Sequence, residues 1–141
     1  MMGGYLTFQG IDGRGRWRRT PVEEALPVTM LPYDDRLEIP EGFRAKWSSC
    51  PITRSCTGCK ANGRCCWAPT RSKPRAGAQV LAQLPAEQGG HPLLVAGEFG
   101  QGRSVAWTSD VGPHWLPNSF LVWPGYARLW LNLLSWVTKL S

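Results

Sequence analysis

The sequence predicts an α/β domain, and three observations near its C-terminal end support that class. Residues 93–96 form a continuous apolar strand, residues 100–102 supply a glycine-containing turn, and residues 104–107 return as a second strand. Polar residues 108–115 then leave the strand end, a place where α/β sheets commonly present their chemistry. Pro124 opens a final helix, whose apolar residues at near-helical spacing should pack on the sheet: Ala127, Trp130, Leu131, Leu134 and Val137 or Leu140.

A short helix is predicted to begin just after residue 20. Thr20 is a capping residue, Pro21 stands at the first helical position, and two acids occupy the first turn. We expect this helix to continue to about Leu26 and to end at Pro27. The Gly- and Arg-rich residues 9–20 before it are typical of a surface loop.

Three further segments are candidate strands. Residues 1–8 combine a short apolar run with two glycines, which is typical of a strand that passes into a turn. Residues 28–31 and 36–39 flank a turn formed by residues 32–35. The strands of the first part of the chain should therefore be short.

Length and composition describe one small domain or part of a larger one. The chain has 141 residues, 43% of them hydrophobic, and a formal net charge of +6, which suggests a nucleic acid or another anionic partner. The most apolar stretch, residues 120–140, is interrupted by Pro124, Arg128 and Asn132, so it predicts a buried helix and no membrane partner. Because the first residues do not form an export signal, we expect a cytoplasmic protein.

All five cysteines lie in one basic segment: Cys50, Cys56, Cys59, Cys65 and Cys66. One interpretation is a zinc site formed by Cys56, Cys59, Cys65 and Cys66, since Cys56 and Cys59 have the two-residue spacing of a zinc knuckle. Against it, Cys65 and Cys66 are adjacent and the segment contains no histidine. A disulfide framework is disfavoured because the chain shows no export signal.

Residues 46–72 have a third interpretation, a frameshifted reading. Codons for these residues exist that, read from the third base of the first codon, encode VELLPDHPILHGLQGEWPLLLGANEV, a peptide with apolar runs and no cysteine. A base lost before Lys46 and a base gained near Ser72 would restore the frame at Lys73. Five of the chain's basic residues lie in this anomalous segment, so the net charge gives little support to a nucleic-acid partner. A zinc site and an unusual genuine loop remain the alternatives.

Four stretches outside that segment carry a family resemblance. They are residues 2–10 (MGGYLTFQG), 20–28 (TPVEEALPV), 97–103 (GEFGQGR) and 107–115 (WTSDVGPHW). They resemble the C-terminal half of a bacterial family of glutamine amidotransferase-like proteins, related to the class I glutamine amidotransferase fold and to ThuA-like proteins. The family has an HPI…GL…WP…LLG…N pattern at the anomalous segment, which the shifted reading supplies and the printed sequence lacks.

The resemblance implies a flavodoxin-like three-layer sandwich with a mostly parallel sheet. Residues 1–141 would then be the C-terminal part of a single amidotransferase-like domain, incomplete at the N-terminus, beginning at the strand that leads into the nucleophile turn. Sheet edges and helix-binding faces would be uncovered in such a fragment. We therefore expect self-association, and hence a homo-oligomer.

The resemblance also points to site residues. Class I amidotransferases hydrolyse glutamine with a cysteine on a tight strand-to-helix turn, activated by a histidine that an acid orients. The corresponding substrate-binding turn here contains Gly3, Gly4, Tyr5 and Gln9, with Tyr5 at the position of the cysteine. A phenol, with a pKa of about 10, substitutes poorly for a thiolate, so the usual thioester route is not expected.

His114 and Asp110 are the remaining catalytic candidates. His114 would act as general base or substrate ligand, with Asp110 setting its tautomer. Alternatively, both residues stabilise their own loop, and Tyr5 serves packing. The function predicted is a glutamine amidotransferase-like protein acting on a small molecule, without a cofactor. The alternatives are a non-catalytic ligand-binding or interaction domain of the same fold and a zinc-binding nucleic-acid module.

Overall fold

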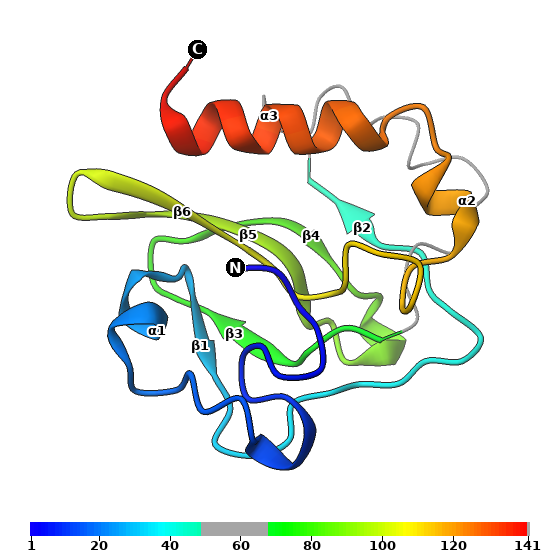
Figure 1. The fold of residues 1–141 in the computed structure, drawn as a ribbon, viewed down its shortest axis with the longest axis horizontal. Helices are drawn as coiled ribbons and strands as arrows, with labels where there is room; N and C mark the ends of the chain where they lie inside the picture. The colour runs from blue at the N-terminus through cyan, green and yellow to red at the C-terminus, as the bar shows by residue number, and fades with distance from the viewer. Residues whose placement is uncertain (49–67, 141) are drawn as a thin grey trace.

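A computed structural model describes residues 1–48 and 68–140 of the chain (Figure 1). The strands are β1 (Val28–Met30), β2 (Lys46–Trp47), β3 (Ser72–Pro74), β4 (Gln79–Gln83), β5 (Pro92–Phe99) and β6 (Gly102–Trp107). The helices are α1 (Pro21–Ala25), α2 (Asn118–Leu121) and α3 (Tyr126–Thr138), with short 3-10 helices η1 (Ile11–Gly13) and η3 (Ala86–Gln88).

Both sheets are antiparallel, and this corrects the expected flavodoxin-like sandwich with a mostly parallel sheet. One sheet has the strand order β2-β4-β5-β6 and the other pairs β1 with β3. Among the described residues, the single parallel pairing is an isolated bridge between Met2 and Trp107. The reason lies in the connections, since β5 returns as β6 through a tight turn at Gly100 and Gln101. A parallel neighbour needs a crossover of about a dozen or more residues.

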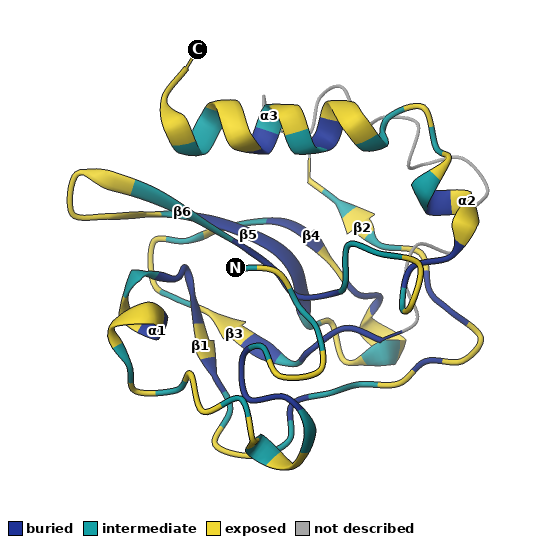
Figure 2. Cartoon of the chain, viewed as in Figure 1, coloured by how far each residue is buried: buried dark blue, intermediate teal, exposed yellow. Residues whose placement is uncertain are grey.

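Both faces of the four-stranded sheet are covered. Helix α3 lies across one face, and α1 with the β1-β3 pair lies on the other (Figure 1). From Leu94 onward residues of β5 alternate between these faces: Leu94 and Ala96 join the core under α3, while Val95 joins the core beside β1. Figure 2 shows this part of β5 as buried. This two-sided burial explains why residues 93–96 form a continuous apolar run.

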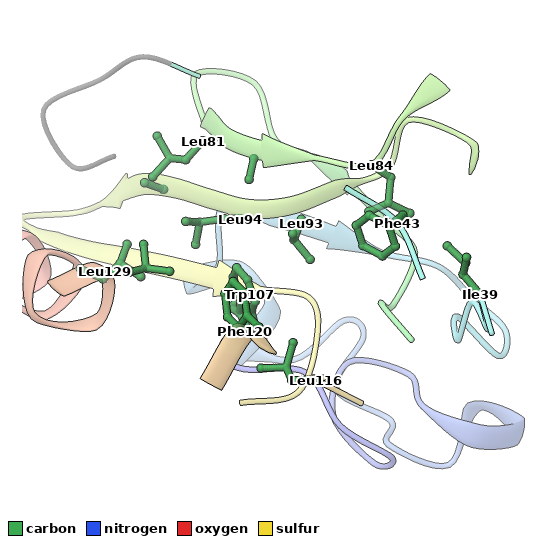
Figure 3. Packing of buried hydrophobic residues seen from close by; sticks show 13 residues of the cluster. Ile39, Phe43, Leu81, Leu84, Leu93, Leu94, Trp107, Leu116, Phe120 and Leu129 are labelled. Atoms are coloured by element: carbon green, nitrogen blue, oxygen red, sulfur yellow. The ribbon is translucent and has the colours of Figure 1, made fainter. Parts of the chain in front are cut away.

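The core under α3 is the larger of the two, and Figure 3 shows its packing. Trp107, fully buried at the end of β6, stacks on Phe120 with ring centroids 6.0 Å apart and meets the edge of Trp130 at 5.5 Å. Other buried members come from β4, β5, α3 and the segments before and after them: Ile39, Phe43, Leu81, Leu84, Leu93, Leu94, Leu116, Leu129 and Leu133. Trp107 therefore joins the end of β6 to both C-terminal helices.

Several local predictions are confirmed. The β5-β6 hairpin forms in the expected place, with Leu94 opposite Trp107 and Phe99 opposite Gly102. Helix α1 begins at Pro21, and its cap Thr20 accepts a hydrogen bond from the Glu23 N–H. Strong local signals therefore gave correct elements.

Three local predictions are wrong. Residues 1–8 form no strand, and within them Met2 makes an isolated bridge to Trp107. Residues 36–39 form no strand, and Arg36 makes an isolated bridge to Thr70. Helix α3 packs on the sheet as expected, and Trp130 of the expected face contacts the core, but the buried residues of the helix are Leu129 and Leu133. The helix begins two residues after Pro124, and other residues of the expected face are exposed: Ala127, Leu131, Leu134 and Leu140. The helix has apolar residues on two sides. The side with Leu129 and Leu133, beside which Trp130 and Trp136 also contact the core, packs on the sheet.

The two ends of the anomalous segment that the structure describes, residues 46–48 and 68–72, are bonded to the rest of the fold. Lys46 and Trp47 pair with Gln83 and Ala82 of β4, and the Thr70 N–H donates to the carbonyl of Thr108 at 2.6 Å. Residues 49–67, with all five cysteines, lie outside the described residues, and the frameshift interpretation stays a prediction. Within the part of the chain that is described, no helix has the length and apolar character needed to cross a membrane.

Candidate functional site

The turn formed by residues 3–9 lies directly against the loop that follows β6. The Gly3 N–H donates to the Trp107 carbonyl at 2.8 Å, which fixes the start of the turn. A Cβ atom at Gly3 would stand 2.8 Å from the Ser109 carbonyl oxygen, closer than packing allows. Only glycine lets these two backbones approach in this way.

A buried carboxylate holds the other end of this turn. Asp35 is fully buried and accepts hydrogen bonds from the N–H groups of Gln9 and Gly10, both at 2.9 Å. Gly10 has a φ of 65°, and a Cβ there would lie 2.3 Å from the Tyr5 carbonyl oxygen. Burial raises the pKa of Asp35 to about 6, although the two N–H donors act in the opposite direction.

Arg36 forms an ion pair beside the turn. Its Nη2 lies 2.8 Å from Oδ2 of Asp34, and its Nε lies 3.1 Å from Oδ1. The hydrogen bond from Arg36 holds the pKa of the Asp34 carboxyl well below its usual range. The guanidinium also lies over the ring of Tyr5, 5.7 Å from its centroid. The guanidinium over the Tyr5 ring is therefore already paired with an acid.

Three rings meet at the exposed surface of the turn. Tyr5, with 49% of its surface exposed, stacks on Trp115 with centroids 5.3 Å apart and an interplanar angle of 27°. The ring of His114 lies 6.0 Å from Tyr5 and 5.3 Å from Trp115. Across the described residues, the His114 side chain has no hydrogen bond or ion pair. We call Tyr5, His114 and Trp115 the ring cluster.

Asp110 is engaged with its own loop. Its Oδ1 accepts hydrogen bonds from the N–H groups of Val111 at 2.7 Å and Gly112 at 3.2 Å. Its backbone carbonyl accepts a hydrogen bond from Nε1 of Trp107 at 2.9 Å. The structure thus brings His114 to Tyr5, and the carboxylate of Asp110 is positioned to shape the loop that carries His114.

The other turn residues named from the sequence have structural partners. The side-chain oxygen of Gln9 accepts a hydrogen bond from the Arg18 N–H at 3.1 Å, which closes the loop between them. The Gly4 carbonyl accepts a hydrogen bond from the Thr7 hydroxyl at 3.2 Å. Gln9 and Gly4 therefore keep the turn compact, while Tyr5 presents its ring to the surface.

Sequence reasoning missed Asp35, Arg36 and Trp115. Trp115 follows His114 in a polar loop, and its position beside this histidine could have marked it as a candidate site residue. Asp35 and Arg36 gave no local signal because their partners in the turn lie far away in the chain, 26 residues in the case of Asp35 and Gln9.

A metal site is not supported by the residues that the structure describes. Among them, no group of three or more His, Cys, Asp or Glu side chains is arranged to hold a metal ion. The proposed zinc ligands Cys56, Cys59, Cys65 and Cys66 lie outside these residues.

The fold and the site define a small α/β domain in which a glycine-dependent turn presents a tyrosine to a histidine-bearing loop. Residues 1–139 match the model of the family described as "Putative glutamine amidotransferase". The chain therefore belongs to this glutamine amidotransferase-like family, which confirms the resemblance found in the sequence.

Two solved structures from Salmonella are similar to the chain. The cytoplasmic protein STM3548 of Salmonella typhimurium is 36% identical with a TM-score of 0.85, over 97% of this chain and 53% of that one. The cytoplasmic protein STM1381 of Salmonella typhimurium LT2 is 34% identical with a TM-score of 0.85, over 97% of this chain and 54% of that one. The chain thus spans about half the length of these relatives. No curated protein matches it.

Proposed function

We propose that this chain contributes a non-covalent binding site for a small carboxamide ligand within the glutamine amidotransferase-like family. The observation that carries the proposal is the ring cluster, where Tyr5, His114 and Trp115 gather at an exposed turn next to the loop after β6. Binding sites commonly combine aromatic walls with a few polar groups in this way.

The residue at the turn argues against the thioester route. Tyr5 stands where the family resemblance places a cysteine, and a phenol lacks the nucleophilic sulfur that forms the thioester. Asp35 occupies the N–H groups of Gln9 and Gly10, which leaves those two donors unable to stabilise an oxyanion. The residues after Tyr5 form turns and the 3-10 helix η1, so in the described chain no α-helix begins directly after Tyr5.

The chemistry of the cluster favours a flat, uncharged group. The exposed aromatic surface of the Tyr5–Trp115 stack suits contact with a planar amide or ring, and the imidazole of His114 can donate or accept a hydrogen bond. Arg36 forms an ion pair with Asp34, so its positive charge is less available to bind an anionic ligand. A carboxamide fits these three properties.

Titration with L-glutamine tests the proposal. We expect saturable binding by calorimetry and a change in tryptophan fluorescence, because Trp115 lies in the cluster. Tyr5→Ala and Trp115→Ala should each weaken binding by about tenfold, or about 1.4 kcal/mol. Tyr33→Ala is the matched control, since Tyr33 is 55% exposed and lies over Arg71, outside the cluster. Binding that the cluster variants leave unchanged would overturn the proposal.

A second candidate function is amide hydrolysis with His114 as general base. The observation in its favour is the exposed imidazole of His114, free of hydrogen bonds in the described part of the chain and beside Tyr5. Glutamate release that His114→Ala abolishes, with L-glutamine binding retained, would select this candidate. Binding without any glutamate release selects the first.

A further inference from the structure

The shape of the ring cluster cannot separate a carboxamide from the corresponding carboxylate. L-Glutamine and L-glutamate have the same chain length, and each side chain ends in a planar group of similar size. The two side chains differ in charge, because the carboxyl of L-glutamate is ionised at neutral pH. A site that prefers the amide must therefore discriminate by the charges and hydrogen-bonding groups around the rings.

The cation over the ring of Tyr5 is already engaged by two acids. The guanidinium carbon of Arg36 lies 5.7 Å from the centroid of the Tyr5 ring. The Nη2 and Nε atoms of Arg36 donate to Oδ2 and Oδ1 of Asp34 at 2.8 and 3.1 Å, and Nη1 lies 3.8 Å from Oε1 of Glu38. Because the Arg36 side chain is only 20% exposed, water screens its pair with Asp34 incompletely. Little of the charge of this arginine is left for a ligand.

Backbone groups also hold the carboxylate of Asp34 in place. The N–H of Arg36 donates to its Oδ1 and the N–H of Asp12 donates to its Oδ2, both at 3.0 Å. The hydrogen bond from the Arg36 side chain holds the pKa of the Asp34 carboxyl well below its usual range, so this acid stays ionised at neutral pH. A ligand carboxylate would therefore have to compete with a fixed, ionised acid for Arg36.

Within the described residues, the charged groups next to this pair do not supply a spare cation. Two further acids lie close to it in the sequence: Asp35, which is buried, and Glu38, which is exposed. Arg71 donates from Nη2 to the Asp34 carbonyl at 2.9 Å, and its guanidinium lies over the ring of Tyr33, 5.8 Å from the centroid. A carboxylate at the ring cluster would therefore meet acids and an engaged arginine on the side of this pair.

We infer that the Asp34–Arg36 pair makes the ring cluster selective for a carboxamide over the corresponding carboxylate, with Asp34 as the residue that determines this specificity. The inference rests on the proposed binding of a carboxamide at Tyr5. A carboxylate at the cluster would lose part of its hydration, and it would face aromatic rings with negative partial charge and an arginine whose charge is offset. A neutral amide loses less hydration and needs no cation, so the amide is preferred.

Asp34→Asn tests the inference, because it removes the charge of the acid and leaves Arg36 in place. Calorimetric titration with L-glutamine and with L-glutamate gives the ratio of their dissociation constants, and this ratio reports on the side-chain group because the rest of the two molecules is the same. We expect the wild type to bind L-glutamine at least about tenfold more tightly. Asp34→Asn should reduce this preference at least about threefold by strengthening L-glutamate binding. Arg36→Gln should increase the preference, because Asp34 then lies near the ligand without its partner.

Glu87→Gln is the matched control. Glu87 is exposed on η3 and forms no ion pair within the described chain, and its substitution changes the net charge by the same amount as Asp34→Asn. The preference should stay at the wild-type value. Circular dichroism checks that each variant is folded, and Arg36→Gln tests the same pair with the opposite sign if Asp34→Asn does not fold.

Two results would overturn the inference and leave the ring cluster as a binding site. They are a wild type that binds L-glutamine and L-glutamate equally well, and folded variants of the pair that keep the wild-type preference. An equal change in Glu87→Gln and Asp34→Asn would also overturn it, since the net charge would then set the preference. Absence of L-glutamine binding in the wild type would overturn the proposed function itself, and this inference with it.

Discussion

The N-terminal turn and helix α3 are held to the same sheet by different forces. The turn depends on a buried carboxylate, Asp35, which receives two N–H groups at 2.9 Å. Helix α3 depends on apolar packing on the sheet by residues such as Leu129, which Figure 3 labels, and Leu133. Hydrogen bonds fix direction as well as distance, whereas apolar packing mainly demands filled volume.

This difference predicts which kind of change should destabilise each region. A turn that rests on an ionisable group in a buried position responds to removal of that group and to pH. A helix that rests on close packing responds to lost volume and is insensitive to charge on its outer side. The ring cluster lies on the turn, so the candidate site should share the turn's sensitivity.

The largest effect should come from a cavity under α3. Leu129→Ala removes a fully buried side chain and should lower the free energy of unfolding by about 4 kcal/mol. Leu131→Ala, two residues along the same helix but 60% exposed, should change it by no more than about 0.5 kcal/mol. Urea denaturation measures both, and equal effects would show that α3 does not pack as described.

The next effect should come from the turn. Asp35→Ala leaves the N–H groups of Gln9 and Gly10 buried without acceptors and should cost about 3 kcal/mol. Asp34→Ala, its neighbour, removes a partly exposed ion pair with Arg36 and should cost about 1 kcal/mol or less. The same denaturation experiment compares them, and a larger loss for Asp34→Ala would refute the role assigned to Asp35.

A smaller effect should appear on changing pH. Because the folded pKa of Asp35, about 6, lies above its unfolded value, its contribution to stability is greatest at low pH and declines as the pH rises through 6. From about pH 4.5 to about pH 6.5 the decline should be about 2 kcal/mol. Burial lowers the pKa of His91, which acts in the opposite sense on stability, so the wild type must be compared with a variant.

The comparison variant for the pH experiment is Asp35→Asn. It cannot ionise at this position, so the difference in unfolding free energy between it and the wild type isolates Asp35 from His91 and Asp34. Asp34 acts in the other direction: its folded pKa is lowered, so its contribution is present above pH about 4 and is lost as the pH falls further. A pH-independent difference would mean that Asp35 titrates alike in both states.

The smallest effect should come from the cap of α1, where the chain leaves the turn region. Thr20→Ala removes the hydroxyl that accepts the Glu23 N–H at 3.4 Å and should cost about 1 kcal/mol. Thr20→Ser keeps the hydroxyl and should restore most of this loss. A thermal melt resolves the two variants, and equal melting temperatures would show that the cap contributes nothing.

The sequence predicted elements whose signals are local. Thr20, Pro21 and the following acids specified α1, and the glycines between residues 99 and 103 specified the β5-β6 hairpin. Sheet topology was not local information, and the family resemblance supplied a parallel sheet that the short connections do not permit. The buried side of α3 was ambiguous because the helix carries apolar residues on two sides.

The candidate site was predicted only where its residues are neighbours in sequence or carry the family motif. His114, Asp110 and Tyr5 were named from the sequence, and the structure places His114 and Tyr5 together. Asp35 could not be found, since its role arises from burial against a turn 25 residues away. Burial and distant pairing are properties of the folded chain, and no short pattern encodes them.

The backbone of the turn is independent of the side chain at residue 5. Gly3, Gly10 and Asp35 fix the path of the chain, and Tyr5 contributes only its backbone carbonyl, which accepts the Ile11 N–H at 3.0 Å. The phenol hydroxyl makes no hydrogen bond within the described residues. Residue 5 is consequently a position where one codon change can exchange an aromatic ring for a thiol, or the reverse, without remodelling the scaffold. The chemistry of the side chain presented at this turn is thereby separable in evolution from the backbone contacts that hold the turn.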